Sequence, residues 1–299
     1  MARVVLGWAA VWLIAVVLVQ ALVAIAPGDA IDTLPDPALR AQLAVDWGLA
    51  QPAWRRVLDG TVNAMVGAWG TSWTVRPGSE VAPLIAQGLW ASAPVGLGAW
   101  GVALAVGLGA RGRGAPVLVL VSAVPVVLLT VGLIEGVNAG VWEGMTRGWW
   151  QRPGFFALPT EAGPVRDALL ILALGLGSGV AGEVAARLAE ADATLIKAGF
   201  VLARRARGQP VAGLLWRHRV VPLLEAAQAA FGPTVGGLVI VERLFARPGL
   251  GDLLWRAVEG RDVPVATGVV LAVAGATVLL SAGVDLGRRA WDPRLGGAS

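Results

Sequence analysis

Residues Val4–Ala26 read VVLGWAAVWLIAVVLVQALVAIA, an apolar run in which Gln20 is the only strongly polar residue. A helix that crosses roughly 30 Å of hydrocarbon at 1.5 Å per residue needs about 20 apolar residues. The run is long enough and predicts a first transmembrane helix. A cleaved signal peptide is the alternative, because Ala24-Ile25-Ala26 has the small-x-small form of a cleavage site. However, the run exceeds a normal signal-peptide core, and Pro27 would directly follow the cut.

The composition of the whole chain agrees with a bilayer environment. Of 299 residues, 56% are hydrophobic and only 15% charged, whereas soluble domains carry about 25% charged residues. Cysteine is absent and His218 is the only histidine, which excludes disulfides, cysteine-ligated metals and a multi-histidine site. The net charge of +4 is too small to indicate a nucleic-acid partner. We expect neither a metal nor another cofactor.

Five further apolar segments are long enough to cross a bilayer, and together with the first they predict an all-α integral membrane protein with six transmembrane helices. They are Gly88–Ala110, Ala115–Ile134, Ala168–Val184, Leu223–Val241 and Pro264–Val284. Six crossings place both termini on one side. The tight turn with Arg111 and Arg113 and the basic loop 185–222 lie on that same side, while most acidic residues lie opposite. The positive-inside rule therefore predicts cytoplasmic termini.

Two loops are too long to be simple connections, and we expect function to reside there. The domain organisation predicted is a first helix at 1–26, an outer periplasmic or extracellular loop at 27–84, a transmembrane core at 85–285 that includes the cytoplasmic loop 185–222, and a cytoplasmic tail at 286–299. The outer loop is rich in Pro, Gly and Trp and is expected to form a small ordered cap. Its tryptophans are interfacial belt residues or docking anchors: Trp47, Trp54, Trp69 and Trp73.

The predicted spans lack the groups that drive transport or catalysis. Their middle regions offer only Gln20 and Gln228, and Glu183 lies near the inner end of the fourth span. A proton- or sodium-coupled transporter normally carries an acidic residue in this zone. No Lys or His lies in a span to activate a hydroxyl nucleophile. The chain is therefore not predicted to be an enzyme.

Glycine motifs in the spans do not indicate a nucleotide site. Gly96-x-Gly98-x-x-Gly101 matches the dinucleotide fingerprint but lies inside an apolar span with no strand before it. Gly175 and Gly179 lie one helical turn apart in the fourth span. We expect both sets to permit close approach of helices. No lysine follows a phosphate-binding glycine loop, so the energy for any transport must come from a partner.

The cytoplasmic loop predicts a short basic helix from Phe200 to Arg207 that ends at Gly208. Glycine suits a left-handed cap at the end of a helix, and Pro210 suits the first turn of the next one. A second helix over Val211–Val220 would lead into the fifth span. The alternative is a positively charged loop that only sets membrane topology.

Two stretches of the sequence resemble a known family. The loop Ala203-Arg-Arg-Ala-Arg-Gly208, followed by Arg217-His218, resembles the EAA loop of binding-protein-dependent ABC importer permeases, most closely the oligopeptide/dipeptide subgroup. The stretch Gly236–Gly251 resembles that subgroup's GG-x-x-x-x-E-x-x-F-x-x-PGLG pattern. The ten loop residues that would couple to an ATPase are Ala203, Arg204, Arg205, Ala206, Arg207, Gly208, Gln209, Pro210, Arg217 and His218.

Shorter matches extend the resemblance over nearly the whole chain, most weakly at 135–165. They are Pro27-Gly28-Asp29, Gly48-Leu-x-x-Pro52, Gly67–Ser72, Val81 with Leu84-Ile85, Arg261-Asp262-Val-Pro264-Val and Asp292-Pro293-Arg294. The chain departs from the family pattern at three places. Arg204 replaces a small residue, Val221-Pro222 replaces a polar Arg-Asn pair, and Ala226 occupies a position that is often proline.

The resemblance implies the architecture and partners of a type I ABC importer permease: six helices, a cytoplasmic coupling helix and a large outer loop after the first helix. It implies a translocation pathway for a peptide or similar small solute in a bacterial or archaeal inner membrane. The partners implied are a second permease subunit, cytoplasmic ATPase subunits, an extracytoplasmic solute-binding protein and membrane lipids. A non-transporting membrane scaffold or receptor subunit is the alternative function.

The same resemblance places a re-entrant turn just outside the fifth span, where it could gate the outer mouth of the pathway. A capped outer helix without a gating role is the alternative interpretation. The residues of this expected gate are Glu242, Phe245, Pro248, Gly249 and Gly251.

Overall fold

A computed structural model describes residues 2–25, 31, 35–110, 114–148 and 163–291. Three features of the sequence lie outside these residues: the turn with Arg111 and Arg113, the Pro27–Asp29 motif and the terminal Asp292–Arg294 motif.

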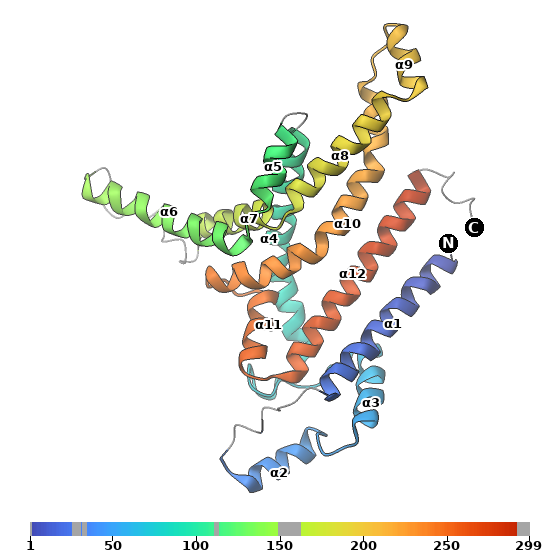
Figure 1. Ribbon diagram of the computed structural model, residues 1–299. Coiled ribbons are helices and arrows are strands. Elements are labelled where there is room, and N and C mark those ends of the chain that lie inside the picture. Colours follow the sequence, from blue (N-terminus) through green and yellow to red (C-terminus); the bar gives the residue numbers. More distant parts are fainter. Residues whose placement is uncertain (1, 26–30, 32–34, 111–113, 149–162, 292–299) are drawn as a thin grey trace. The chain divides into compact units, whose positions relative to one another are not determined.

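Helices account for nearly all of the described structure (Figure 1). Within the described ranges, the only strand-like pairing is an isolated bridge between Thr71 and Glu80. The all-α prediction is therefore confirmed. The helices are α1 Ala2–Ile25, α2 Pro37–Asp46, α3 Ala53–Met65, α4 Val81–Gly109, α5 Gly114–Ser122, α6 Val126–Thr146, α7 Pro164–Gly177, α8 Val180–Ile196, α9 Gly199–Ala206, α10 Ala212–Leu244, α11 Leu250–Glu259 and α12 Val263–Trp291.

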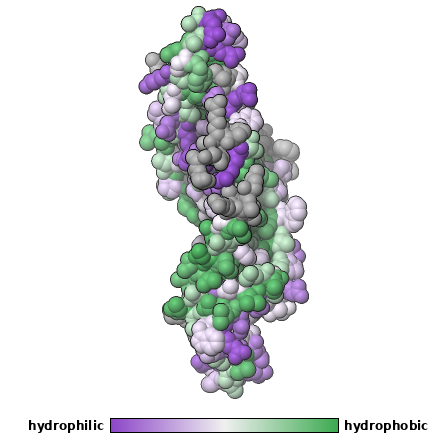
Figure 2. All heavy atoms as spheres, turned by 90° about the vertical axis from the view of Figure 1, so that its right-hand side faces the viewer, coloured by the Kyte–Doolittle hydropathy of each residue, from purple (hydrophilic) through white to green (hydrophobic). Residues whose placement is uncertain are grey.

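Five of the described helices are long and apolar enough to cross a membrane, namely α1, α4, α6, α10 and α12. Helices α7 and α8 pass the same test together but are bent by 45° at their junction, and they make a sixth crossing if the pair is one span. Much of the apolar surface is exposed, as expected for side chains that face lipid. Figure 2 shows hydrophobic side chains spread over a wide area of one face.

The third predicted span, Ala115–Ile134, is not one helix. Helix α5 ends at Ser122, and α6 begins after Pro125 and continues to Thr146. Proline has no N–H for the helical ladder, and its ring disfavours helical geometry in the preceding residue. The proline therefore breaks the segment that hydropathy alone joined, and α6 continues beyond Ile134, the predicted end of the span.

The fourth and fifth spans also differ from expectation. Gly179 adopts a left-handed φ of +80° and separates α7 from α8, a conformation that glycine enters at little cost. In contrast, the short helix predicted for Val211–Val220 and the fifth span form one continuous helix, α10. This helix starts at Ala212 and contains Pro222 and Pro233 in its interior.

The described chain divides into two compact units, each with its own apolar core. The first comprises residues 1–92 and 248–282, and the second comprises residues 93–247 and 283–299. In the first unit, α4, α11 and α12 bury a cluster formed by Val81, Leu84, Ile85, Leu250, Leu253, Ala257, Val265 and Val269. In the second unit, α4, α6, α7 and α10 bury another, formed by Val95, Ala99, Val126, Leu170, Ala173, Leu174, Val241 and Phe245.

Glycines permit close helix contacts at some of the predicted positions. A Cβ on Gly98 would lie 2.9 Å from Ile171 Cδ1, and one on Gly175 would lie 2.8 Å from the Ala99 carbonyl oxygen. Close approach is thus confirmed for these two residues. The prediction of close approach is wrong for Gly101, which faces open space. It is also wrong for Gly179, which forms the turn between α7 and α8.

The long loop after α1 is ordered where the structure describes it and contains α2 and α3. Asp36 caps α2 by accepting a 2.9 Å hydrogen bond from the Ala38 N–H. Helix α3 lies beside α1 (Figure 1). Gln20 Nε2 donates to the Gly60 carbonyl over 3.3 Å, and Arg56 Nη2 donates to the Ala24 carbonyl over 2.8 Å. The single amide of the first span therefore finds its partner in α3.

Asp262 ties the end of this loop to the start of α12. Its carboxylate is fully buried. Oδ2 accepts hydrogen bonds from Ser72 Oγ at 2.6 Å and from the Thr74 and Val75 N–H groups at 2.9 and 3.0 Å. Oδ1 accepts a bond from the Val265 N–H at 3.3 Å, which caps α12. One side chain thus joins two segments that the sequence places 190 positions apart.

The same contacts set the ionisation of Asp262. Burial by itself would raise the pKa of the carboxyl, but the hydrogen bonds from Ser72 and from the backbone of residues 73–75 outweigh burial. Together they hold the pKa below its ordinary value of 3.8. The ionised form is therefore the one that the fold stabilises.

Asp262→Asn should lower the free energy of unfolding by about 2 kcal/mol at neutral pH, because hydrogen bonds to a charged acceptor are lost. A lowered pKa contributes stability above the unfolded-state pKa, and this contribution is lost as the pH falls through the folded-state pKa. Thermal unfolding in detergent should show a constant gap between wild type and variant above about pH 5 and a narrowing gap below about pH 4. Equal stability at pH 7 would contradict the assignment.

Helix α11 packs so closely on α4 that Gly88 leaves no room for a side chain. A Cβ at this position would lie 3.1 Å from Leu250 Cα. Gly88→Ala should therefore cost about 1 kcal/mol through overpacking. Gly101→Ala on the same helix is the matched control, since Gly101 faces open space, and it should be neutral or stabilising. Equal melting temperatures for the two variants would refute the tight contact.

Candidate functional site

The predicted basic helix is present as α9 and forms a stub between α8 and α10 (Figure 1). We call residues 197–211 the stub. Gly208 has a left-handed φ of +69°, and its N–H donates to the Arg205 carbonyl over 2.9 Å. The Gln209 N–H donates to the Arg204 carbonyl over 3.1 Å. The glycine cap is thus confirmed, and it ends α9 in a fixed turn rather than an open loop.

The stub presents basic and apolar side chains to its surroundings. Arg205 and Arg207 are exposed, while Val201 is buried and anchors the helix. Phe200 and Leu202 are 51% and 52% exposed. Such a mixed surface can dock on a protein that carries acidic and apolar groups, or on anionic lipid headgroups.

The ten residues proposed for coupling fall in two adjacent helices and in the short link between them, where Gln209 and Pro210 lie. Ala203 to Gly208 lie in α9 and its cap, and Arg217 and His218 lie in the second turn of α10. The ring of His218 stacks on Phe200 at a centroid distance of 5.8 Å. The two parts of the motif therefore meet. Pro210 lies before α10, whose N-cap is Val211, and it does not occupy the first helical turn as expected.

Ion pairs at the base of the stub were not foreseen from the sequence. Glu225 on α10 pairs with Arg187 on α8 at 3.6 Å and with Arg288 on α12 at 2.9 Å. Arg187 also pairs with Glu183 at 2.6 Å. Among these ion pairs, only Glu183–Arg187 could have been predicted from the sequence, because opposite charges four residues apart on a helix are neighbours. The others join helices that are distant in sequence.

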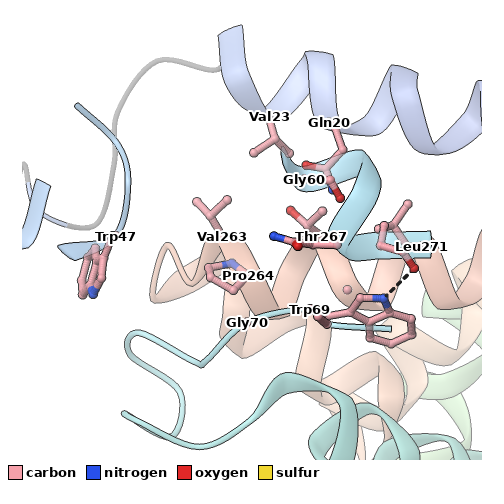
Figure 3. Close-up of a pocket in the computed structure, with 14 residues that line it drawn as sticks. Gln20, Val23, Trp47, Gly60, Trp69, Gly70, Val263, Pro264, Thr267 and Leu271 are labelled. Atoms are coloured by element: carbon pink, nitrogen blue, oxygen red, sulfur yellow. Dashed lines mark hydrogen bonds between the residues drawn. The ribbon is translucent and has the colours of Figure 1, made fainter. Parts of the chain in front are cut away.

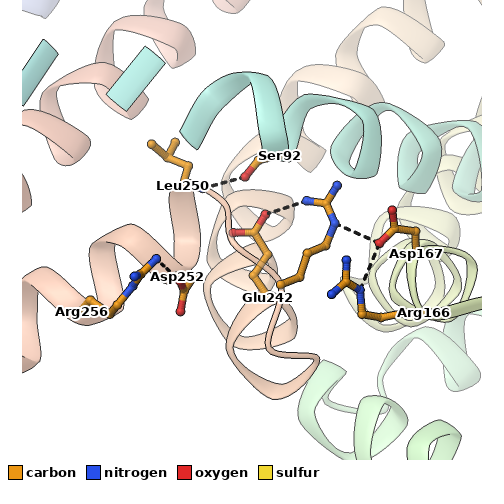
Figure 4. A network of polar contacts seen from close by, with 8 residues as sticks. Ser92, Arg166, Asp167, Glu242, Leu250, Asp252 and Arg256 are labelled. Atoms are coloured by element: carbon orange, nitrogen blue, oxygen red, sulfur yellow. Dashed lines mark hydrogen bonds and ion pairs between the residues drawn. The ribbon is translucent and has the colours of Figure 1, made fainter. Parts of the chain in front are cut away.

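The expected outer gate begins at the end of α10, in the second unit (Figure 4). Glu242 and Phe245 are fully buried. Arg247 reaches back to Glu242, with Nη1 3.9 Å from Oε1, and its Nε donates to Asp167 Oδ1 over 3.0 Å. Ala246, between them, has a left-handed φ of +48°, which is uncommon for a residue with a side chain. The turn after α10 is thus held by an arginine latch that sequence reasoning missed.

The rest of the expected gate belongs to the first unit. Gly249 is extended and precedes α11, and Gly251 is buried in its first turn. The Leu250 N–H donates to Ser92 Oγ on α4 over 2.8 Å (Figure 4). The hydroxyl of Ser92, a residue of a span, therefore accepts a hydrogen bond from an N–H at the start of α11. Such N–H groups have no carbonyl partner within their own helix. The boundary between the two units falls between Arg247 and Pro248.

A pocket of about 260 Å³ lies within the first unit (Figure 3). Its polar side chains are the amides of Gln20 and Asn63 and the hydroxyl of Thr267. Trp47 and Trp69 contribute indole rings. The Trp47 ring stacks on Trp73 at 4.3 Å, and Trp69 donates from Nε1 to the Ala64 carbonyl over 3.4 Å. Among the described residues, the lining carries no charged group, so this part of the pocket suits a neutral ligand.

The described residues also offer no candidate metal site. In the part of the chain that the structure describes, no three His, Cys, Asp or Glu side chains gather where they could hold a metal ion.

Comparison with known proteins agrees with an all-helical chain that carries several candidate membrane spans. A family model described as "Binding-protein-dependent transport system inner membrane component" matches residues 98–297, more than half of the chain. The glutathione transport system permease protein GsiC of Salmonella paratyphi A is 26% identical to this chain, over 97% of this chain and 96% of that protein. The di/tripeptide transport system permease protein DppB of Pseudomonas aeruginosa is 26% identical, over 92% of each.

Membership of this family implies an ATPase and a binding protein as partners in the assembled importer. The helices long enough to cross a membrane fit a multi-pass inner-membrane protein. The chain therefore belongs to the binding-protein-dependent transport system inner membrane component family and is the permease subunit of an ABC importer.

Proposed function

We propose that this permease forms the pathway for short peptides, including glutathione-like tripeptides, that a binding protein delivers. The names of its relatives support this substrate class, since they transport glutathione and di- or tripeptides. The chain works with a second, different permease subunit and has no ATPase site of its own. Both termini and the stub lie in the cytoplasm, and the loop after α1 lies on the outer side, where the binding protein docks.

The observation that carries the coupling mechanism is the rigid, capped stub with exposed basic and apolar side chains. A short helix fixed by Gly208 can transmit the movement of an ATPase as a rigid body. Arg205 and Arg207 are exposed and can pair with carboxylates of the ATPase.

Replacing Arg205 and Arg207 by Glu should turn two exposed positive charges of the stub into negative charges. Buried contacts should remain undisturbed. We expect the ATPase that co-purifies with the tagged chain to fall at least about tenfold. ATP hydrolysis in the purified complex should fall with it. Mass spectrometry and an ATPase assay of the eluate provide the measurement.

Arg55→Glu is the matched control, because Arg55 is 61% exposed on α3 and pairs only weakly with Asp59, at 3.9 Å. It should leave ATPase recovery unchanged. Unchanged recovery in the stub variant would instead show that the stub rests on lipid or merely sets topology. Absence of any ATPase with the wild-type chain would favour a scaffold without transport.

The outer gate is the second part of the proposal and comprises Glu242, Phe245, Pro248, Gly249 and Gly251. The chain passes from one compact unit to the other within this turn. A turn that joins two separately packed units can act as a hinge. The arginine latch to Asp167 and Glu242 lies within the second unit and would fix the side of the turn that follows α10.

Asp167→Asn should weaken the latch and raise ATP hydrolysis in the absence of peptide by about two- to fivefold in the reconstituted importer. Arg256→Gln is the control, because Arg256 pairs with Asp252 within α11 and does not connect separate elements. It should leave basal hydrolysis unchanged. If Asp167→Asn behaves like this control, the latch does not restrain the gate.

A further inference from the structure

A two-point ion pair joins the arms of the stub. On α10, Arg219 donates from Nε to Asp192 Oδ1 on α8 over 2.8 Å and from Nη2 to Oδ2 over 2.5 Å. The two side chains are only 11% and 24% exposed. Parallel bonds between a guanidinium and a carboxylate fix orientation as well as distance. Removing one partner of such a pair leaves the other charge buried and uncompensated.

The helices are otherwise loosely packed at this level. A hollow of about 280 Å³ lies beside the pair and is lined by both of its side chains. A second hollow of about 390 Å³ lies between α8 and α10 and is lined by His218, Pro222 and Glu225, among others. The apolar packing of α8 on α10 begins deeper, where Ala226 and Ala230 are buried. The ion pair therefore joins the two arms on the stub side of this apolar packing.

Pro222 makes such a tie necessary. This proline lies inside α10, so the carbonyl of residue 218 lacks its usual N–H partner four residues on. Helices bend most readily at such prolines. Arg219 lies three residues before Pro222, on the side of the proline that leads to the stub. Without the ion pair, the first two turns of α10 could swing about Pro222.

We propose that Asp192 and Arg219 are positioning residues for energy coupling, a brace that makes the stub and the adjoining ends of α8 and α10 move as one body. This inference rests on the proposed docking of the stub on an ATPase. The brace does not touch solute or nucleotide. It determines how much of the ATPase movement is transmitted to the spans. Without it, part of that movement would only bend α10 at Pro222.

The test measures ATP hydrolysed per peptide imported, with the complete importer in proteoliposomes. Arg219→Gln and Asp192→Asn should retain the ATPase but raise this ratio at least about threefold. The charge swap Asp192→Arg with Arg219→Asp should restore it. Pro222→Ala in the Arg219→Gln background should also restore it, because residue 222 then has an N–H for the helical ladder. Arg147→Gln, in an exposed pair at the end of α6 and outside the stub, should leave the ratio unchanged.

Each outcome decides the matter. A normal ratio in both single variants, or an uncoupled charge swap, overturns the brace. If the single variants do not assemble, the charge swap alone decides, since normal coupling supports the brace and uncoupling refutes it. Failure of the wild-type complex to retain an ATPase would refute the proposed docking itself, which is a different result from a normal ratio in the variants.

Discussion

The buried carboxylate of Asp262 is the constraint on which the first unit depends. It accepts hydrogen bonds from the turn at 72–75 and from the first turn of α12, so loop and helix share one charged acceptor. The burial of an ionised group is tolerated because its oxygens are satisfied in this way. The same turn leads directly into α4, on which α11 packs. Loss of the carboxylate would therefore weaken three features together: the turn at 72–75, the start of α12 and the packing of α4 with α11.

The second unit uses ion pairs for the same purpose. Arg247 holds the turn after α10, and Arg187, Arg219 and Arg288 join helices near the stub. The basic side chains of this protein are nearly all arginine, whose planar guanidinium can bind a carboxylate at two points. Pro125 and Gly179 separate successive helices, and Pro222 removes one N–H from the interior of α10. Ties of this kind between helices fit a transport subunit that relays movement.

Hydropathy and local rules predict much of this fold but not its ties. The all-α class, an ordered outer loop and the Gly208 cap follow from apolar runs, loop composition and helix-end chemistry. The prediction of one continuous span over Ala115–Ile134 was wrong. Hydropathy is averaged along the segment and does not detect the break at Pro125. The motif residues Ser72 and Asp262 were recognised separately by family resemblance, but their contact joins distant segments. The partners of Arg219 and Arg247 likewise depend on tertiary structure, which residue spacing does not encode.

Hydrogen–deuterium exchange of the purified chain tests most directly whether Asp262 fixes the loop to the core. The N–H groups of Thr74 and Val75 lie in an irregular turn and would exchange within seconds if the turn were free. The structure predicts that both exchange as slowly as the amides of α11, because opening them requires the buried carboxylate to lose its partners. Rapid exchange at both positions, beside slow exchange in α11, would contradict the account.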